Sequence, residues 1–394
     1  QDSSSAASDV YKRQGLMGEG MTIAVIDAGF RGVDTAAPFQ PLWEEGRLLA
    51  HRNIAEQNDS TFAHSSHGTN VLSLIAAKVP GFYLGTAPNA NFLLLRSEVT
   101  AFELAIEEDN WVAAAEFADS AGADILTTSL GYTTFDKPEM DFSYSQMDGN
   151  TTLITRGADI AASKGMLVIN SAGNSGNNSW HFIGAPADGD SVLTVGAVNS
   201  EGEKADFSSF GPTPDGRVKP NVMSMGRGNA VINSEGGFSF GSGTSFAAPI
   251  LSGMAACLWQ AFPEKTSMEI FEAIQQSAHL YNNPNDSMGH GIPNFTKAYF
   301  QLSDVPEPPV SGVGVFPNPT DGMFYIYVEG STNENATVQV FDLSGKKMSE
   351  QEAELFKDAF IAIPVDVLNK AQSGVYVVNV QSQTIDKQVK VVKN

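Results

Sequence analysis

Short apolar runs alternate with amphipathic stretches over the first three quarters of the chain. Each run is as long as one buried strand and ends in glycine, asparagine, aspartate or serine. We expect strands at Thr22–Asp27, Asn91–Arg96, Asp124–Ser129, Met166–Asn170 and Val192–Val198. The longer stretches between and after them favour helices at Asn70–Lys78, Phe102–Ala121, Thr155–Lys164, Ser245–Phe262 and Ser267–Ser277. Buried strands that alternate with helices predict an α/β domain whose mainly parallel sheet is covered on both faces.

The pattern changes after Ala298, where the proline-rich segment 304–311 predicts a stiff linker. Beyond it, short alternating runs separated by turn residues predict a small all-β sandwich over 312–394. The strands are expected at Met323–Val328, Thr337–Asp342, Phe360–Ile363, Val375–Gln381 and Lys387–Val392. No constellation of catalytic residue types occurs in this part.

The formal charge of the 394-residue chain is −22. Ten acidic residues and seven lysines lie in 310–394, which therefore carries −3 and leaves −19 for the rest. This balance argues against nucleic acid and anionic membranes as partners. An acidic surface can attract cationic substrates or calcium, or simply keep the protein soluble. No apolar run approaches the ~20 residues that span a bilayer.

Three short motifs bring together the residue types of a serine nucleophile, its base and an orienting acid. Asp27 ends a buried strand, His67 precedes an apolar helix in HSSHGTN, and Ser245 begins another helix in GTSFAAP. A hydroxyl at a helix N-terminus lies beside free N–H groups that can stabilise an oxyanion. A fourth motif, NSAGNSG, offers the side-chain amide of Asn174 as a second oxyanion donor. Taken singly, each residue is more often a turn, a cap or a surface group.

In the order Asp, His, Ser, these motifs resemble the subtilisin-like serine peptidases, or subtilases, over about Gly18 to Ala298. The resemblance implies a three-layer subtilisin-like fold and a secreted endopeptidase with Asp27, His67 and Ser245 as its triad. The base is assigned to His67 rather than the neighbouring His64, because Gly68 and Thr69 follow it as in the family. No cofactor is implied for the chemistry. Structural calcium is common in the family, but no ligand loop is recognisable here.

Two further segments resemble the family's substrate-binding walls. Ser129, Leu130 and Gly131 match the edge that pairs with an extended peptide, which is the expected substrate. Ser171, Ala172 and Gly173 resemble the opposite wall of the pocket for the residue before the scissile bond. The alternative is that both segments are only tight strand-end packing.

The C-terminal part resembles the sorting domain of proteins exported by the type IX secretion system. The resemblance rests on FPNP from Phe316, VFDLSGK from Val340 and SGVY from Ser373. It implies export through that machinery and a secreted or surface-attached protein. A substrate- or surface-binding module is the alternative for this part.

The predicted organisation is a non-native or disordered leader at 1–17, a peptidase domain at 18–303, a linker at 304–311 and a sorting domain at 312–394. Gln1–Gln14 has no apolar signal-peptide core, and no propeptide is recognisable before Asp27, so we expect either a processed start or a foreign leader, of which the polar run Asp2–Ser8 favours the second. The alternative function is a non-catalytic surface or adhesion protein on a subtilase scaffold. A lipase or esterase is disfavoured, because the Gly-x-Ser-x-Gly elbow is missing and the motif order differs.

Overall fold

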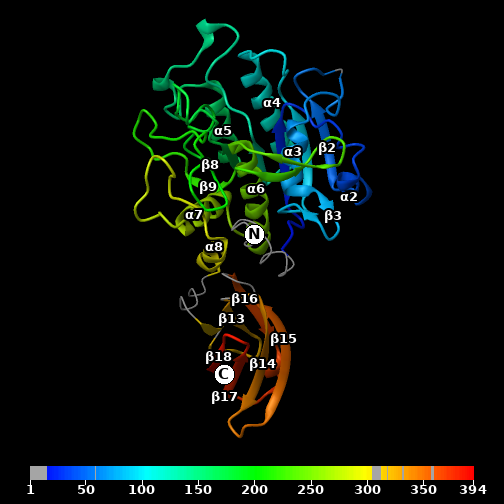
Figure 1. Ribbon diagram of the computed structural model, residues 1–394, viewed down its shortest axis with the longest axis vertical. Coiled ribbons are helices and arrows are strands. Elements are labelled where there is room, and N and C mark those ends of the chain that lie inside the picture. The colour runs from blue at the N-terminus through cyan, green and yellow to red at the C-terminus, as the bar shows by residue number, and fades with distance from the viewer. Residues whose placement is uncertain (1–15, 58, 304–311, 317, 331, 356–358) are drawn as a thin grey trace. The chain divides into compact units, whose positions relative to one another are not determined.

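The computed structural model describes residues 16–57, 59–303, 312–316, 318–330, 332–355 and 359–394 (Figure 1). The described chain forms two compact units, one up to Ala298 and one from Tyr299 onward. Most of the expected leader and the whole expected linker, 1–15 and 304–311, lie outside the described residues.

The first unit is built on a seven-stranded sheet in the order β2-β5-β1-β6-β7-β8-β9. All its strand pairs are parallel, so the mainly parallel sheet is confirmed. Its strands are β1 Thr22–Asp27, β2 Leu48–Asn53, β5 Asn91–Arg96, β6 Ile125–Thr128, β7 Leu167–Ser171, β8 Val192–Val198 and β9 Val222–Met225. Two small antiparallel pairs accompany it: β3 Lys78–Val79 with β4 Tyr83–Leu84, and β10 Asn229–Ile232 with β11 Phe238–Gly241.

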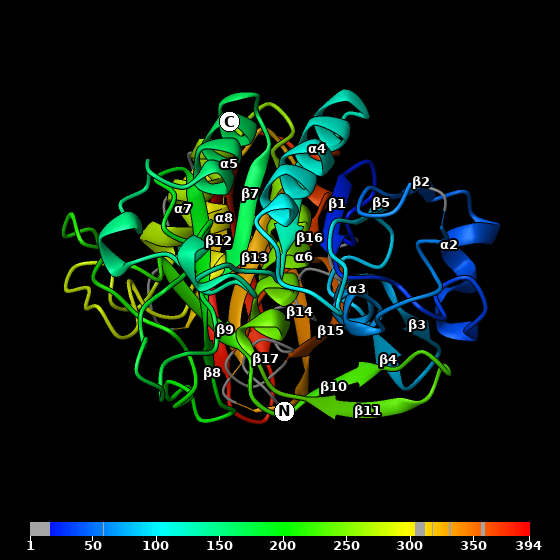
Figure 2. The same ribbon diagram turned by 90° about the horizontal axis from the view of Figure 1, so that it is seen from above.

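Helices cover both faces of this sheet (Figure 2). Successive side chains along β1 point to opposite faces and therefore contact different helices. Ala24 and Ile26 belong to the core that contains the apolar faces of α4 Ile106–Ser120 and α5 Leu153–Ser163. The opposite face carries α3 His67–Ala76 and the long buried helix α6 Thr244–Ala261. The remaining helices are α2 Gln40–Glu44, α7 Ser267–Ser277 and α8 Phe295–Leu302. Short 3₁₀ turns lie at Ala37–Phe39, Pro138–Met140 and Tyr144–Gln146.

The switch in strand order determines where a site can form. The chain passes from β1 outward to β2 and β5, and then crosses to β6 on the other side of β1. In open parallel sheets, ligands bind beyond the carboxyl ends of the strands at such a point. Asp27 ends β1, and Ser129 directly follows β6.

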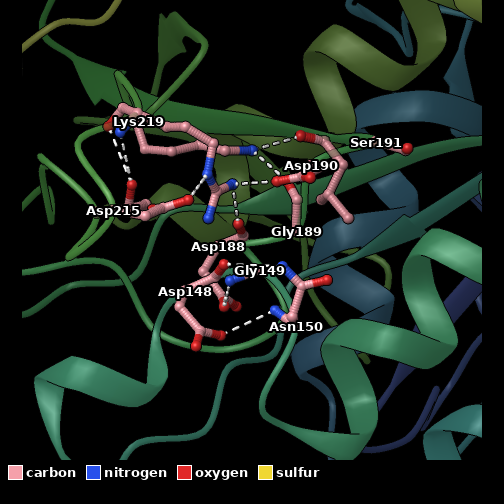
Figure 3. A network of polar contacts seen from close by, with 12 residues as sticks. Asp148, Gly149, Asn150, Asp188, Gly189, Asp190, Ser191, Asp215 and Lys219 are labelled. Carbon is pink, nitrogen blue, oxygen red and sulfur yellow. Dashed lines mark hydrogen bonds and ion pairs between the residues drawn. The ribbon is translucent and has the colours of Figure 1, made fainter.

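A buried polar network supports the loops that precede β8 and β9 (Figure 3). The Lys219 ammonium donates to the carbonyl oxygens of Gly189 (2.7 Å) and Val192 (2.7 Å). It also donates to Asn221 Oδ1 (2.9 Å) and Thr194 Oγ1 (3.0 Å). Because Lys219 is buried, these four oxygens replace the water that its charge would otherwise need.

From Val313 onward the second unit is built of antiparallel strands, as predicted. One sheet has the order β12-β13-β16 and the other β15-β14-β17-β18, and residues from both sheets share one apolar core. The strands are β12 Val313–Phe316, β13 Phe324–Gly330, β14 Glu334–Asp342, β15 Lys347–Leu355, β16 Ala359–Val365, β17 Gly374–Gln381 and β18 Asp386–Lys393, with a 3₁₀ turn at Val367–Lys370.

Candidate active site

Asp27 is held rigidly at the centre of the sheet edge. It is the last residue of β1, between β5 and β6, and its side chain has no exposed surface. Its Oδ1 accepts the backbone N–H of Ala28 at 2.8 Å. A carboxylate that is fixed and desolvated in this way can hold one tautomer of a neighbouring imidazole.

His67 provides that imidazole. It is the first residue of α3, three residues earlier than the expected start of this helix, and its Nδ1 lies 2.9 Å from Asp27 Oδ1 and 3.0 Å from Oδ2. Gly68 makes the approach possible, since a Cβ there would lie 2.6 Å from the carbonyl oxygen of Gly29 and 2.9 Å from Asp27 Cβ. The glycine of the HSSHGTN motif therefore lets the helix begin directly on the end of β1.

The charge of Asp27 raises the pKa of His67 above its ordinary value. Burial acts in the opposite direction, and the hydrogen bond to Asp27 and the charge of Glu98 add to the increase. With Nδ1 donating to Asp27, the neutral ring presents an unprotonated Nε2 for accepting a proton.

Ser245 is the second residue of α6, where its N–H has no partner within the helix. Its Oγ lies 3.4 Å from the carbonyl oxygen of Ser129, to which it donates. Pro249 has no N–H to give to the carbonyl four residues earlier, which is that of Ser245. The Ser129 hydroxyl donates to this carbonyl instead, at 2.9 Å. The proline of GTSFAAP thus allows the start of α6 to be anchored to the end of β6.

Asn174 lies beside this helix start with a defined orientation. Its Oδ1 accepts the backbone N–H of Thr244 at 2.9 Å and the Thr244 hydroxyl at 3.1 Å. With Oδ1 occupied, the Nδ2 amide is the end of the side chain that remains for a ligand. Sequence reasoning missed the role of Thr244, although this residue stands inside the motif that contains Ser245.

These groups surround one cleft of about 400 Å³. His67, Asn174 and Ser245 line it, whereas Asp27 lies outside the lining and contacts His67. All six residues expected to bind substrate line it as well: Ser129, Leu130, Gly131, Ser171, Ala172 and Gly173. Sequence reasoning did not find the other side chains that line it, which include Glu98, Thr100, Glu103 and Phe182.

His64, the alternative base, is engaged elsewhere. Its Nε2 lies 2.6 Å from Asp59 Oδ2, and it is absent from the cleft lining. Within the described ranges, Glu56, Asp59 and His64 are the one group of candidate metal ligands whose ligand atoms lie within 4.8 Å of one another. Arg96 forms an ion pair with Glu56 at 2.7 Å, so a cation is already present beside this group.

Sequence comparison matches residues 18–291 to the Subtilase family. The chain belongs to the subtilase family. The matched segment contains every side chain of the cleft, so this subtilase is a serine-type endopeptidase by family. Residues 314–394 match a secretion system C-terminal sorting domain, which makes the protein a secreted or cell-surface one.

Curated relatives are similar to this subtilase over its first unit. Serine protease AprX of Bacillus subtilis is 29% identical over 323 residues, which cover 74% of this chain and 69% of AprX. Subtilisin E of the same species is 29% identical over 68% of this chain and 63% of its own length. Subtilisin DY of Bacillus licheniformis is 27% identical over 72% of this chain and 91% of its own length.

Solved structures show the same fold. The self-cleaved protease domain of PatA superposes with a TM-score of 0.58 at 25% identity, covering 73% of this chain and 99% of that domain. The MycP3 protease from the type VII (ESX-3) secretion system gives a TM-score of 0.59 at 21% identity, covering 74% and 86%. The subtilisin-like α/β fold with an additional all-β unit is therefore confirmed. Within the described ranges, every helix is too short or too polar to cross a bilayer.

Proposed function

We propose that this subtilase hydrolyses peptide bonds in proteins or peptides through Asp27, His67 and Ser245, with an acyl-enzyme intermediate. The observation that carries the proposal is the contact of the buried Asp27 carboxylate with His67 Nδ1, in a cleft also lined by Ser245. His67 Nε2 takes the proton of the Ser245 hydroxyl as its oxygen attacks the peptide carbonyl. Asp27 stabilises the imidazolium, which then protonates the departing amine. Water, activated by the same imidazole, hydrolyses the ester.

The Asn174 side-chain amide and the backbone N–H of Ser245 donate hydrogen bonds to the tetrahedral oxyanion and stabilise it. Both are prepared before the reaction, because Thr244 holds the carbonyl end of Asn174 and the first turn of α6 leaves the Ser245 N–H unpaired. Donors that are already oriented stabilise developing charge without reorganising. No metal or organic cofactor takes part in this sequence of steps.

The test of the proposal is covalent labelling of the intact protein with a fluorophosphonate, followed by peptide mass spectrometry. We expect a single adduct on Ser245, because only an activated serine reacts rapidly with such a probe. A folded sample that is not labelled would favour the other reading, a surface or adhesion protein on a subtilase scaffold.

Replacing Asn174 with alanine is expected to lower kcat by about 10²- to 10³-fold, the loss seen for one oxyanion donor in subtilisin. KM should change little, because the donor acts mainly on the charge that forms in the transition state. Steady-state hydrolysis of a peptide substrate measures both constants. The matched control is Asn177→Ala at an exposed asparagine of the same loop. A raised KM with unchanged kcat would mean that Asn174 binds the substrate instead.

We also propose that the C-terminal unit delivers the peptidase to a type IX secretion machinery. The support is the match of 314–394 to a sorting domain and the separate apolar core of this unit. Deleting 312–394 should leave the peptidase inside the producing cell, as measured by cell fractionation. Export of the shortened chain at the normal level would contradict this role and favour the binding-module alternative.

A further inference from the structure

One wall of the cleft is acidic. Glu98 and Glu103 both line the cavity that contains His67 and Ser245, and both are partly buried. Glu98 follows the end of β5 by two residues, and the Tyr132 hydroxyl donates to its Oε1 at 2.7 Å. Since Tyr132 directly follows Gly131, Glu98 is fixed beside the segment that is expected to pair with the substrate.

Hydrogen bonds to its backbone anchor the loop that carries these carboxyl groups. Glu107, at the start of α4, accepts the backbone N–H of Val99 at 2.9 Å and of Leu104 at 3.0 Å. The N–H of Asp136 donates to the carbonyl oxygen of Glu103 at 2.9 Å. Both glutamates are thus presented to the cleft by an anchored segment.

In the described part of the chain, Glu98, Glu103 and Glu107 form no ion pair. Burial raises the pKa of Glu107, and the charge of Arg96 offsets only part of this increase. The Arg96 guanidinium is engaged with Glu56 and with the carbonyl oxygen of Ala28.

The pKa values of both glutamates lie above their ordinary value. Burial and neighbouring acidic groups raise the pKa of Glu98 to about 8. Burial, Glu107 and Asp136 raise the pKa of Glu103 to about 7. Carboxyl groups in such surroundings ionise more readily when a cation comes close.

The expected path of the substrate brings its side chains to this wall. A peptide that pairs with Ser129–Gly131 is extended, and its successive side chains point to opposite sides. When the side chain of the residue before the scissile bond points to the wall formed by Ser171–Gly173, the side chain of the second residue before the scissile bond points away from that wall. Glu98, which accepts the Tyr132 hydroxyl, lines the same cleft beside the paired segment and is available to a side chain that points away from Ser171–Gly173.

We propose that Glu98 and Glu103 form a subsite for a lysine or arginine side chain of the substrate, at the second residue before the scissile bond. This subsite rests on the peptidase function proposed above. The incoming ammonium or guanidinium supplies the positive charge that the wall lacks, and it displaces no cation of the protein.

The test uses two fluorogenic tetrapeptides with phenylalanine before the scissile bond, which differ only in lysine or norleucine at the preceding position. We expect kcat/KM to be about ten-fold higher for the lysine peptide, as for one charge-assisted contact in a partly desolvated site. Glu98→Gln and Glu103→Gln should each reduce the lysine-to-norleucine ratio, and the double variant should bring it close to one. Glu116→Gln, at an exposed glutamate of α4, should keep the wild-type ratio.

The outcomes separate this inference from the proposed function. An enzyme that hydrolyses both peptides with a ratio of one or less overturns the subsite and leaves the peptidase intact. A double variant that is still labelled by the fluorophosphonate and retains the wild-type ratio overturns it as well. If neither peptide is hydrolysed and Ser245 is not labelled, the proposed function itself has failed.

Discussion

Ser245→Ala is expected to lose turnover by about a million-fold, the loss observed when the nucleophile of subtilisin is removed. The substitution deletes one oxygen atom at the second residue of α6 and leaves a residue that is favourable in a helix. The Ser129 hydroxyl can still donate to the backbone carbonyl at position 245, so the helix start stays anchored. The loss is therefore chemical: without Oγ there is no ester intermediate, and the base has no proton to take.

Two readouts measure this effect, namely hydrolysis of a fluorogenic peptide and fluorophosphonate labelling. The control is Ser163→Ala at an exposed serine near the end of α5, which should behave like the unaltered enzyme in both. Equal thermal unfolding of the three proteins would show that the fold is unchanged. If Ser245→Ala hydrolyses the peptide at a rate near normal, Ser245 is not the nucleophile.

Asp27→Asn is expected to lower kcat by about 10⁴-fold, as the loss of the orienting carboxylate does in serine proteases. The amide has nearly the shape of the carboxylate but carries no charge. Its NH₂ end facing His67 Nδ1 would favour the tautomer with the proton on Nε2, which cannot accept the proton of Ser245.

A pH profile distinguishes this role from a structural one. The base must be neutral, so activity falls as the pH drops below the pKa of His67. The charge of Asp27 is the largest cause that raises this pKa, and its removal should move the acidic limb of kcat/KM to lower pH. Asp109→Asn, at an exposed position of α4, is the control and should leave the limb unchanged. An acidic limb at the same pH in Asp27→Asn would contradict the assignment of these two residues.

Several of the strands missed by sequence reasoning have weak apolar patterns. The edge strand β2 has only partly buried or exposed residues, and β9 is a short VMSM segment without a clear period. In β15, six of the nine residues are charged or polar, and Leu355 is its single buried residue. Such strands form because a neighbouring strand offers its backbone hydrogen bonds, which no local pattern records.

Sequence alone determined the elements and motifs whose signals are local. Fully buried runs such as Thr22–Asp27 and Val192–Val198 were predicted with their observed bounds, because burial on both faces requires continuous apolar character. The order of Asp27, His67 and Ser245 also led to the family, since each lies in a short motif. Their joint placement at one site follows from the parallel sheet, which brings the carboxyl ends of distant strands to one edge.

Only the tertiary structure decided how these groups are held and what faces them. Nothing local to Asn174 indicates that Thr244 fixes its amide, or that Ser129 replaces the partner that Pro249 removes from the Ser245 carbonyl. The acidic wall was equally hidden, because Glu98 and Glu103 are ordinary loop residues until the fold places them beside Tyr132 and the cleft. Contacts between residues far apart in the chain depend on how helices and strands pack, and that packing sets the chemistry of this site.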